Sequence, residues 1–319
     1  MTQEPLGLFD TPPNRLEVQL GWLCVGLSSV AALVVLPFSG MRLPEVAAFI
    51  PSLNAIIFVG ELIIATLLFA QAAVFRSRAL IVLASGFIFI ALLLVAYVLT
   101  FPGVFARQGL LGAGTNTAAW VMIFRRLAFP IIIISYLVCR SLDPDLSTAT
   151  RNRTVRPAAG LAIAVALAGM ATLVATIGHD ALPPMFINRS EGVYGNLFVF
   201  NITSTILIFG AAVALFLAQR SLLDMWLLVA LAGWLIQSLL NVALSERFTL
   251  GWYALQLVIL FAHLLLLIPL VAESNRLYAR LVLTTASRNR ERDARLLSME
   301  AVAASITHEV RQPLAAISL

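Results

Sequence analysis

Two adjacent residues near the end of the chain, His308 and Glu309, are of types that could do chemistry together. A neutral imidazole is a nucleophile near pH 7, and a neighbouring carboxylate can orient the ring or take its proton during attack on a phosphorus centre. Pro313 removes a backbone donor and clashes with the preceding turn, so a helix bend is predicted just after the histidine. These residues predict a phosphoryl-accepting site, with a solvated pair on an ordinary helix as the alternative.

A zinc-protease motif is excluded at the same place. It would need a second histidine four residues after His308, and that position is Gln312.

The segment that carries His308 has the pattern of a coiled-coil helix. Its apolar residues are spaced four and three apart without interruption, which predicts a seam between two paired helices. His308 falls at the heptad position farthest from the seam, so we expect it to face water in a homodimer. The seam residues are Leu296, Met299, Ala303, Ile306, Val310, Pro313 and Ile317.

The residues around His308 also resemble a known motif. The run H-E-V-R-Q-P-L-A-A-I at 308–317, preceded by A-A-S-I-T, resembles the phospho-acceptor box of sensor histidine kinases. The resemblance implies that His308 is the phosphorylated residue, that Glu309 is its acid/base neighbour and that Pro313 bends the helix. It also implies ATP and Mg²⁺ as cofactors, and a response regulator as the partner that receives the phosphate.

The chain offers no nucleotide site of its own. No phosphate-binding glycine loop or magnesium-binding asparagine lies on a soluble segment, so we expect ATP and Mg²⁺ to bind a kinase domain downstream and no cofactor or metal to bind within residues 1–319. The chain ends at Leu319, inside the first dimerisation helix, so we expect the natural product to continue. The fragment alone is expected to be inactive.

The composition predicts what kind of domain precedes this helix. Of 319 residues, 61% are hydrophobic and 12% are charged, a balance typical of a polytopic membrane protein. The expected fold is all-α, a bundle of about eight transmembrane helices followed by a cytoplasmic coiled-coil helix. The apolar runs lie at about 16–37, 46–73, 79–101, 117–139, 157–178, 193–218, 223–244 and 249–272.

The distribution of arginine predicts the orientation of these spans. With an even number of spans both termini lie on one side, and that side receives most of the arginines outside the tail, whereas the other receives Arg42, Arg107, Arg189 and Arg247. The positive-inside rule then places both termini in the cytoplasm. The resemblance to sensor histidine kinases implies that the membrane is the inner (plasma) membrane of a bacterium. The net charge of +5 is explained by this orientation, so the bilayer rather than nucleic acid is the expected partner. The arginines on the inner side are Arg15, Arg76, Arg78, Arg140, Arg151, Arg153, Arg156 and Arg220.

Spaced motifs between the second and fourth spans form the strongest local pattern. They include Leu43 with Pro44, the run L-T-F-P-G at 99–103, the glycines at 109–114, and Phe129 with Pro130. Together they resemble the membrane-associated sensor domains of the MASE group, most closely its fourth type, which precede bacterial signalling outputs such as histidine kinases. The chain departs from the expected pattern at Arg125 and Arg126, where we expect Trp-His, and at Tyr97, where we expect histidine.

This resemblance divides the chain into four parts. We expect a cytoplasmic N-terminal tail at 1–15, a membrane-associated sensor domain at 16–272, a signalling linker helix at 273–295, and the start of a dimerisation and histidine-phosphotransfer domain at 296–319.

Arg125 and Arg126 are the candidate sensing residues, together with Glu61. Each arginine lies near the middle of an apolar span, where a charge costs about 2.5–3.5 kcal/mol. Glu61 is the only acidic residue deep in a span, so a pair with Arg125 or Arg126 is expected. Such a pair could respond to protonation, ion binding or an anionic ligand, and a purely structural ion pair is the alternative.

Other polar residues in the spans are expected to hydrogen-bond between helices rather than bind a ligand. His263 is the only histidine among them, and the group also contains Asn54, Asn201, Gln237, Asn241 and Gln256.

The sequence thus favours a membrane sensor histidine kinase of a bacterial two-component system, autophosphorylated on His308. The alternative is a membrane receptor, scaffold or transporter whose C-terminal helix only dimerises and carries no phosphate.

Overall fold

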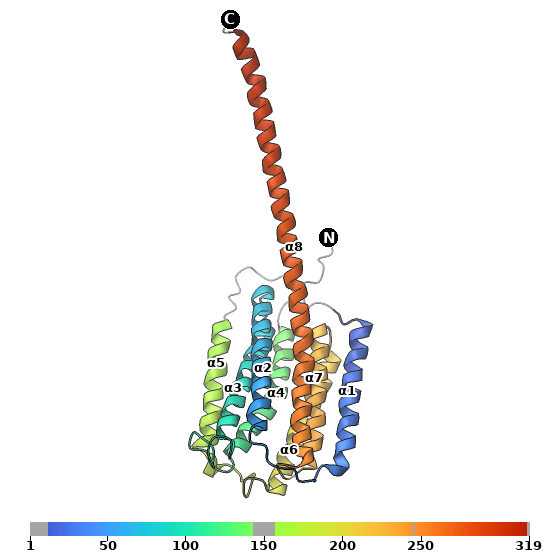
Figure 1. Ribbon diagram of the computed structural model, residues 1–319, viewed down its shortest axis with the longest axis vertical. Coiled ribbons are helices and arrows are strands. Elements are labelled where there is room, and N and C mark those ends of the chain that lie inside the picture. The colour runs from blue at the N-terminus through green and yellow to red at the C-terminus, as the bar shows by residue number, and fades with distance from the viewer. Residues whose placement is uncertain (1–11, 143–156, 245, 318–319) are drawn as a thin grey trace. The chain divides into compact units, whose positions relative to one another are not determined.

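The computed structural model describes residues 12–142, 157–244 and 246–317 of the chain (Figure 1). In these residues the fold is all-α, as predicted, and eight helices are long and apolar enough to cross a membrane. The protein is therefore a multi-pass integral membrane protein. The helices are α1 Arg15–Val35, α2 Phe49–Phe75, α3 Arg78–Thr100, α4 Thr117–Leu142, α5 Pro157–Thr176, α6 Tyr194–Ala218, α7 Leu222–Val242 and α8 Leu250–Ile317, with short 3-10 helices η1 Leu36–Phe38 and η3 His179–Ala181.

The chain divides into two compact units, Met1–Val271 and Ala272–Leu319. Helix α8 contributes to both, because its apolar candidate span Leu250–Arg276 is followed by helical residues through Ile317. The helix predicted for the C-terminal segment is confirmed. Its pairing into a coiled coil stays a prediction.

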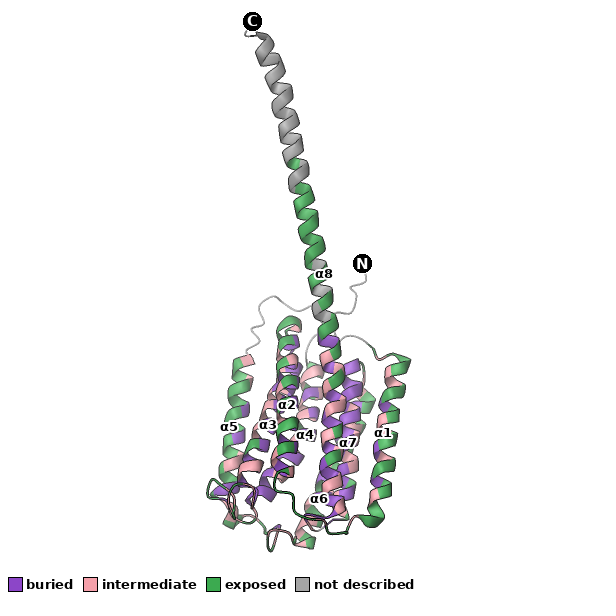
Figure 2. Cartoon of the chain, viewed as in Figure 1, coloured by how far each residue is buried: buried purple, intermediate pink, exposed green. Residues whose placement is uncertain are grey.

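Helices α3 and α7 form the centre of the membrane unit. They are the most buried of the candidate spans, whereas most residues of α1 and α5 are exposed (Figure 2). Helix α3 packs against α2, α4 and α5, and α7 packs against α1 and α6. Since every span is apolar on most of its surface, the exposed side chains of the outer helices are suited to contact lipid rather than water.

Local signals in the sequence explain where the helices begin. Asn14 caps α1 and forms a reciprocal capping box with Glu17, and Ser221 does the same for α7 with Asp224. Each box satisfies backbone N–H groups that the first helical turn leaves without partners. In the connection between α3 and α4, Gly109 has a φ of +93°, a conformation that glycine adopts at little cost.

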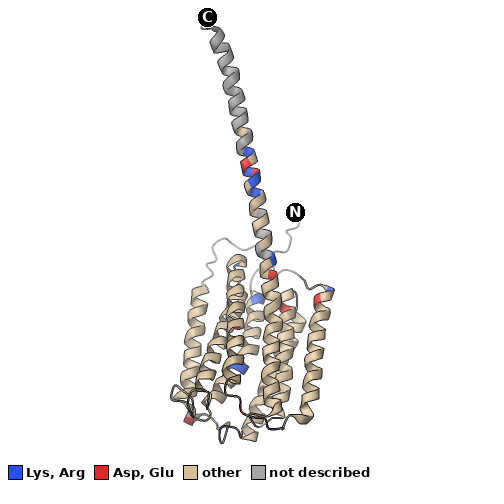
Figure 3. Ribbon diagram, in the orientation of Figure 1, with Lys and Arg blue, Asp and Glu red and all other residues tan. Residues whose placement is uncertain are grey.

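Charged residues are sparse along the membrane helices and gather near their ends (Figure 3). Beyond the span in α8, the arginine-rich stretch from Arg288 to Arg295 is exposed. Charged side chains inside the bundle are therefore exceptions that need partners.

Candidate functional site

Two side chains that the sequence predicted to pair, Glu61 and Arg125, meet inside the bundle. Glu61 of α2 is 0% exposed and Arg125 of α4 is 2% exposed. Arg125 Nη2 donates to Glu61 Oε1 at 2.5 Å. The predicted pairing is thus confirmed for Arg125, whereas Arg126 has other partners. A sensing role for these residues stays a prediction.

His263 of α8 completes this cluster. Its Nε2 lies 2.8 Å from Glu61 Oε1, and its Nδ1 lies 2.7 Å from the carbonyl oxygen of Ile259. A carbonyl can only accept, so Nδ1 carries hydrogen. Nε2 also lies 3.2 Å from Arg125 Nη2, which can donate to it. His263 therefore links α8 to both α2 and α4.

Aromatic rings close the cluster on one side. The guanidinium carbon of Arg125 lies 5.0 Å from the centre of the Trp234 ring, and Phe129 stacks on the same indole with ring centres 4.8 Å apart. A cation over an aromatic face is stabilised by the ring quadrupole, more so when water is excluded. Helices α2, α4, α7 and α8 are thus joined by one buried charge cluster, which we call the Glu61 cluster: Glu61, Arg125, Trp234 and His263.

Arg126 takes part in a separate network of neutral amides. Its Nη1 donates to Asn201 Oδ1 of α6 at 2.7 Å, and Asn201 Nδ2 donates to the backbone carbonyl of Asn241 in α7 at 3.0 Å. With the Asn241 amide turned over, its oxygen also accepts from Arg126. In either orientation these partners carry no charge. The expectation that Asn201 and Asn241 hydrogen-bond between helices is confirmed.

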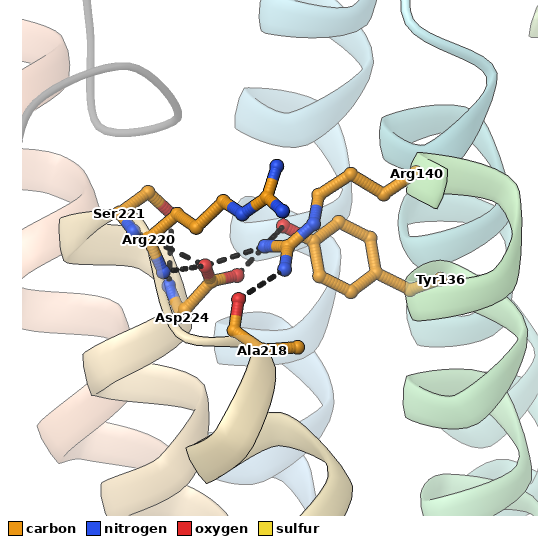
Figure 4. Close-up of polar contacts among 6 residues, drawn as sticks. All are labelled: Tyr136, Arg140, Ala218, Arg220, Ser221 and Asp224. Atoms are coloured by element: carbon orange, nitrogen blue, oxygen red, sulfur yellow. Dashed lines mark hydrogen bonds and ion pairs between the residues drawn. The ribbon is translucent and has the colours of Figure 1, made fainter. Parts of the chain in front are cut away.

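A second ion pair, between a buried carboxylate and a partly buried arginine, lies where α4 ends and α7 begins (Figure 4), and it was not predicted from the sequence. Asp224 is 0% exposed and accepts from Arg140 Nη1 at 2.5 Å and from the Tyr136 hydroxyl at 2.9 Å. It also accepts from the backbone N–H groups of Arg220 and Ser221. The signal available in the sequence was the spacing of Ser221 and Asp224, which is that of a capping box.

Metal-ligating residues do not gather in the described residues, where no three His, Cys, Asp or Glu side chains lie close enough to hold a metal ion. Both ring nitrogens of His263 are engaged, one by Ile259 and one by the Glu61 cluster.

His308, Glu309 and Pro313 lie in α8, whose backbone is helical through Ile317. Their side chains lie outside the described part of the structure, so the phosphoryl-accepting role and the bend stay predictions.

The membrane unit matches a known family. Residues 44–278 match the family model MASE4, described as a membrane-associated sensor, integral membrane domain. The match includes every residue of the Glu61 cluster, and no histidine-kinase dimerisation domain is detected. Curated proteins and solved structures give no match to the chain. Because the matched residues make up more than half of the sequence, the chain belongs to the MASE4 family of membrane-associated sensor domains.

Proposed function

We propose that the chain is the sensing and phospho-acceptor part of a membrane sensor histidine kinase in a bacterial two-component system. The observation that carries the proposal is the placement of His263 and His308 on the same helix, α8. His263 belongs to the buried Glu61 cluster, and His308 opens the H-E-V-R-Q-P-L motif. MASE4 domains are often attached to signalling enzymes, which supports an enzymatic output.

In this proposal α8 transmits the signal. A change in protonation or in an ion contact at the Glu61 cluster alters the contacts of His263, and therefore the packing of α8 against the bundle. A helix transmits such a change along its axis because its backbone hydrogen bonds make it stiff. Two copies of α8, paired along the apolar seam as a homodimer, would then present His308 to the kinase domain or withhold it.

The chemical step at His308 follows from the residue types. The imidazole attacks the terminal phosphorus of ATP, a bond from nitrogen to phosphorus forms, and the bond to the ADP oxygen breaks. Glu309 orients the ring and takes its proton. ATP and Mg²⁺ are held by the downstream kinase domain, and the phosphoryl group then passes to a carboxylate of a response regulator. ATP and the response regulator are both cytoplasmic, so the proposal requires both termini to lie on the cytoplasmic side of the plasma membrane.

Phosphorylation of the complete gene product tests the proposal. The protein, reconstituted in nanodiscs with labelled ATP and Mg²⁺, is expected to acquire acid-labile phosphate that His308→Gln abolishes. Ser298→Ala, on the same helix but outside the motif and the seam, is the matched control that keeps His308 and is expected to retain label. Complete protein that never carries phosphate on His308 would contradict the proposal and would favour a receptor, scaffold or transporter.

A further inference from the structure

A small cavity lies near the end of the bundle where α3 ends and α4 begins. It has a volume of about 100 Å³ and is lined by residues of α3, α4, α6, α7 and α8 and of the connections between them. We propose that this cavity binds a small organic carboxylate. The residues that carry the argument are Arg126, Gln237, Arg247 and Trp252.

The cavity contains two buried cations without an acidic partner. Arg126 is 7% exposed and Arg247 is 5% exposed, and both line the cavity. Among the described residues no carboxylate oxygen lies within 4.0 Å of either guanidinium. Glu246 also lines the cavity, but it already accepts from Arg42 at 3.0 Å. Buried charges are normally paired, because desolvation penalises a lone charge strongly.

The contacts of Arg247 show how it is held without an anion. Its Nη1 donates to the backbone carbonyl of Arg189 at 3.1 Å, and its guanidinium carbon lies 3.7 Å from the centre of the Phe186 ring. Arg189 is itself paired with Glu45 at 2.7 Å. Burial lowers the pKa of Arg247 to about 10, and repulsion from Arg189 adds to this shift. The guanidinium therefore remains charged at neutral pH.

A second feature of the wall points to a ligand. Gln237 is 5% exposed, and its Oε1 has no hydrogen-bond partner among the described residues. A buried amide oxygen without a hydrogen bond destabilises the fold, and a bound polar group that hydrogen-bonds to the amide would remove this cost. Since the two ends of an amide can exchange places by rotation, Gln237 can present either a donor or an acceptor to a ligand.

The remaining walls define the body of the ligand. Phe186, Phe200 and Trp252 line the cavity together with aliphatic side chains. A guanidinium recognises a carboxylate through two parallel hydrogen bonds, and aromatic walls suit an apolar body. An apolar cavity of about 150 Å³ admits benzene, so a cavity of about 100 Å³ suits a short aliphatic carboxylate, smaller than benzoate, such as propionate.

The position of Arg126 connects this cavity to the Glu61 cluster, a connection whose regulatory meaning depends on the proposed function above. Arg126 follows Arg125 directly in α4, and Arg125 holds Glu61. A carboxylate bound to Arg126 adds a negative charge close to Arg125, which lies outside the cavity lining, and so weakens by charge the attraction between Arg125 and Glu61. Ligand binding would thereby loosen the contact from Glu61 to His263 on α8.

Binding of propionate to the full chain tests the proposal without any phosphotransfer readout. In nanodiscs of zwitterionic phosphatidylcholine, isothermal titration calorimetry is expected to show saturable binding of propionate, while propan-1-ol and chloride at the same concentrations show none. Arg126→Gln and Arg247→Gln are each expected to weaken propionate binding at least tenfold. Arg107→Gln is the matched control, because Arg107 is exposed and does not line the cavity.

Gln237→Glu keeps the test decisive if the arginine variants do not fold. The substitution supplies a carboxylate of nearly the same shape, so it is expected to raise Tm by pairing with the guanidinium groups and to abolish propionate binding. The proposal is overturned if propionate binds this variant as well as the unaltered chain. It is also overturned if propan-1-ol binds as tightly as propionate, or if phosphatidylglycerol raises Tm and propionate does not.

Discussion

A single oxygen of Glu61 contacts both Arg125 and His263. Oε1 lies 2.5 Å from Arg125 Nη2 and 2.8 Å from His263 Nε2, whereas Oε2 has no partner among the described residues. With the side chain fully buried, water cannot replace a lost contact. Removing Glu61 or Arg125 would therefore leave the other buried charge without its counter-ion.

Glu61→Gln is expected to destabilise the membrane unit by about 3 kcal/mol, because it leaves the Arg125 guanidinium buried without its counter-ion. Arg42→Gln breaks an ion pair whose arginine side chain is 81% exposed, so it is the control and is expected to cost less than about 1 kcal/mol. Reversible unfolding in mixed micelles measures both. The double variant Glu61→Leu with Arg125→Leu is expected to recover most of the loss, and a double variant less stable than Glu61→Gln would refute this account.

The first turn of helix α7 contains the side chains that anchor it to α4. Its capping box, Ser221 with Asp224, also provides the carboxylate that binds Arg140 and Tyr136 of α4. One acidic residue thus fixes both where α7 begins and which part of α4 it packs against. Polar contacts of this kind are effective between apolar helices, since hydrophobic burial does little to discriminate one apolar face from another inside a bilayer.

Asp224→Asn is expected to destabilise the contact between α4 and α7 by about 2 kcal/mol, because the amide replaces an acceptor of Arg140 with a donor. Ser221→Ala removes only the cap and is expected to cost about 1 kcal/mol. Hydrogen exchange read by mass spectrometry should show faster exchange in the first turn of α7 for both variants. Asn14→Ala, which removes the cap of α1, is the control and should leave exchange in α7 unchanged. Equal exchange in all proteins would show that Asp224 does not hold this end of α7.

At the scale of the whole molecule, α8 is the element that links sensing to output in the proposed function. Its candidate span ends at Arg276 and its helix ends at Ile317. The membrane unit supplies the buried contacts, and the C-terminal unit carries the predicted apolar seam and His308. In the proposed function, a signal reaches His308 along this helix.

Ile306→Asp is expected to prevent pairing of the C-terminal helices, because it places a charge in the predicted seam. Ala304→Asp adds the same charge on the same helix outside the seam, so it is the control and should leave pairing intact. Cross-linking of the full chain in nanodiscs measures the dimer fraction. Equal loss in both variants would mean that charge, and not the seam, controls pairing.

The sequence predicted most of the fold because hydropathy and helix length are local properties. The predicted fourth span, 117–139, corresponds to α4 at Thr117–Leu142, and the predicted sixth, 193–218, corresponds to α6 at Tyr194–Ala218. The MASE resemblance is likewise confirmed by the family match over residues 44–278. Such features depend on runs of consecutive residues, which the sequence shows directly.

The candidate site was predicted in part. Glu61 was expected to pair with an arginine because charges are rare in apolar spans, but the sequence did not distinguish Arg125 from Arg126 as the partner. His263 was predicted only to hydrogen-bond between helices, and its contact with Glu61 was not predicted. Asp224 was missed because it stands at the edge of an apolar run. Arg247 was counted among outer loop residues, although it is buried and shares a cavity with Arg126.

The sequence by itself determined that this chain crosses a membrane with about eight helices, that it resembles a membrane-associated sensor, and that a histidine motif lies near its end. Only the tertiary structure decided that Arg125 and Arg126, adjacent in α4, have different partners, one in an ion pair and one beside a cavity. Successive residues of a helix point about 100° apart, and which neighbour each one meets depends on how the helices are rotated and packed. That rotation is weakly encoded in spans that are apolar all round.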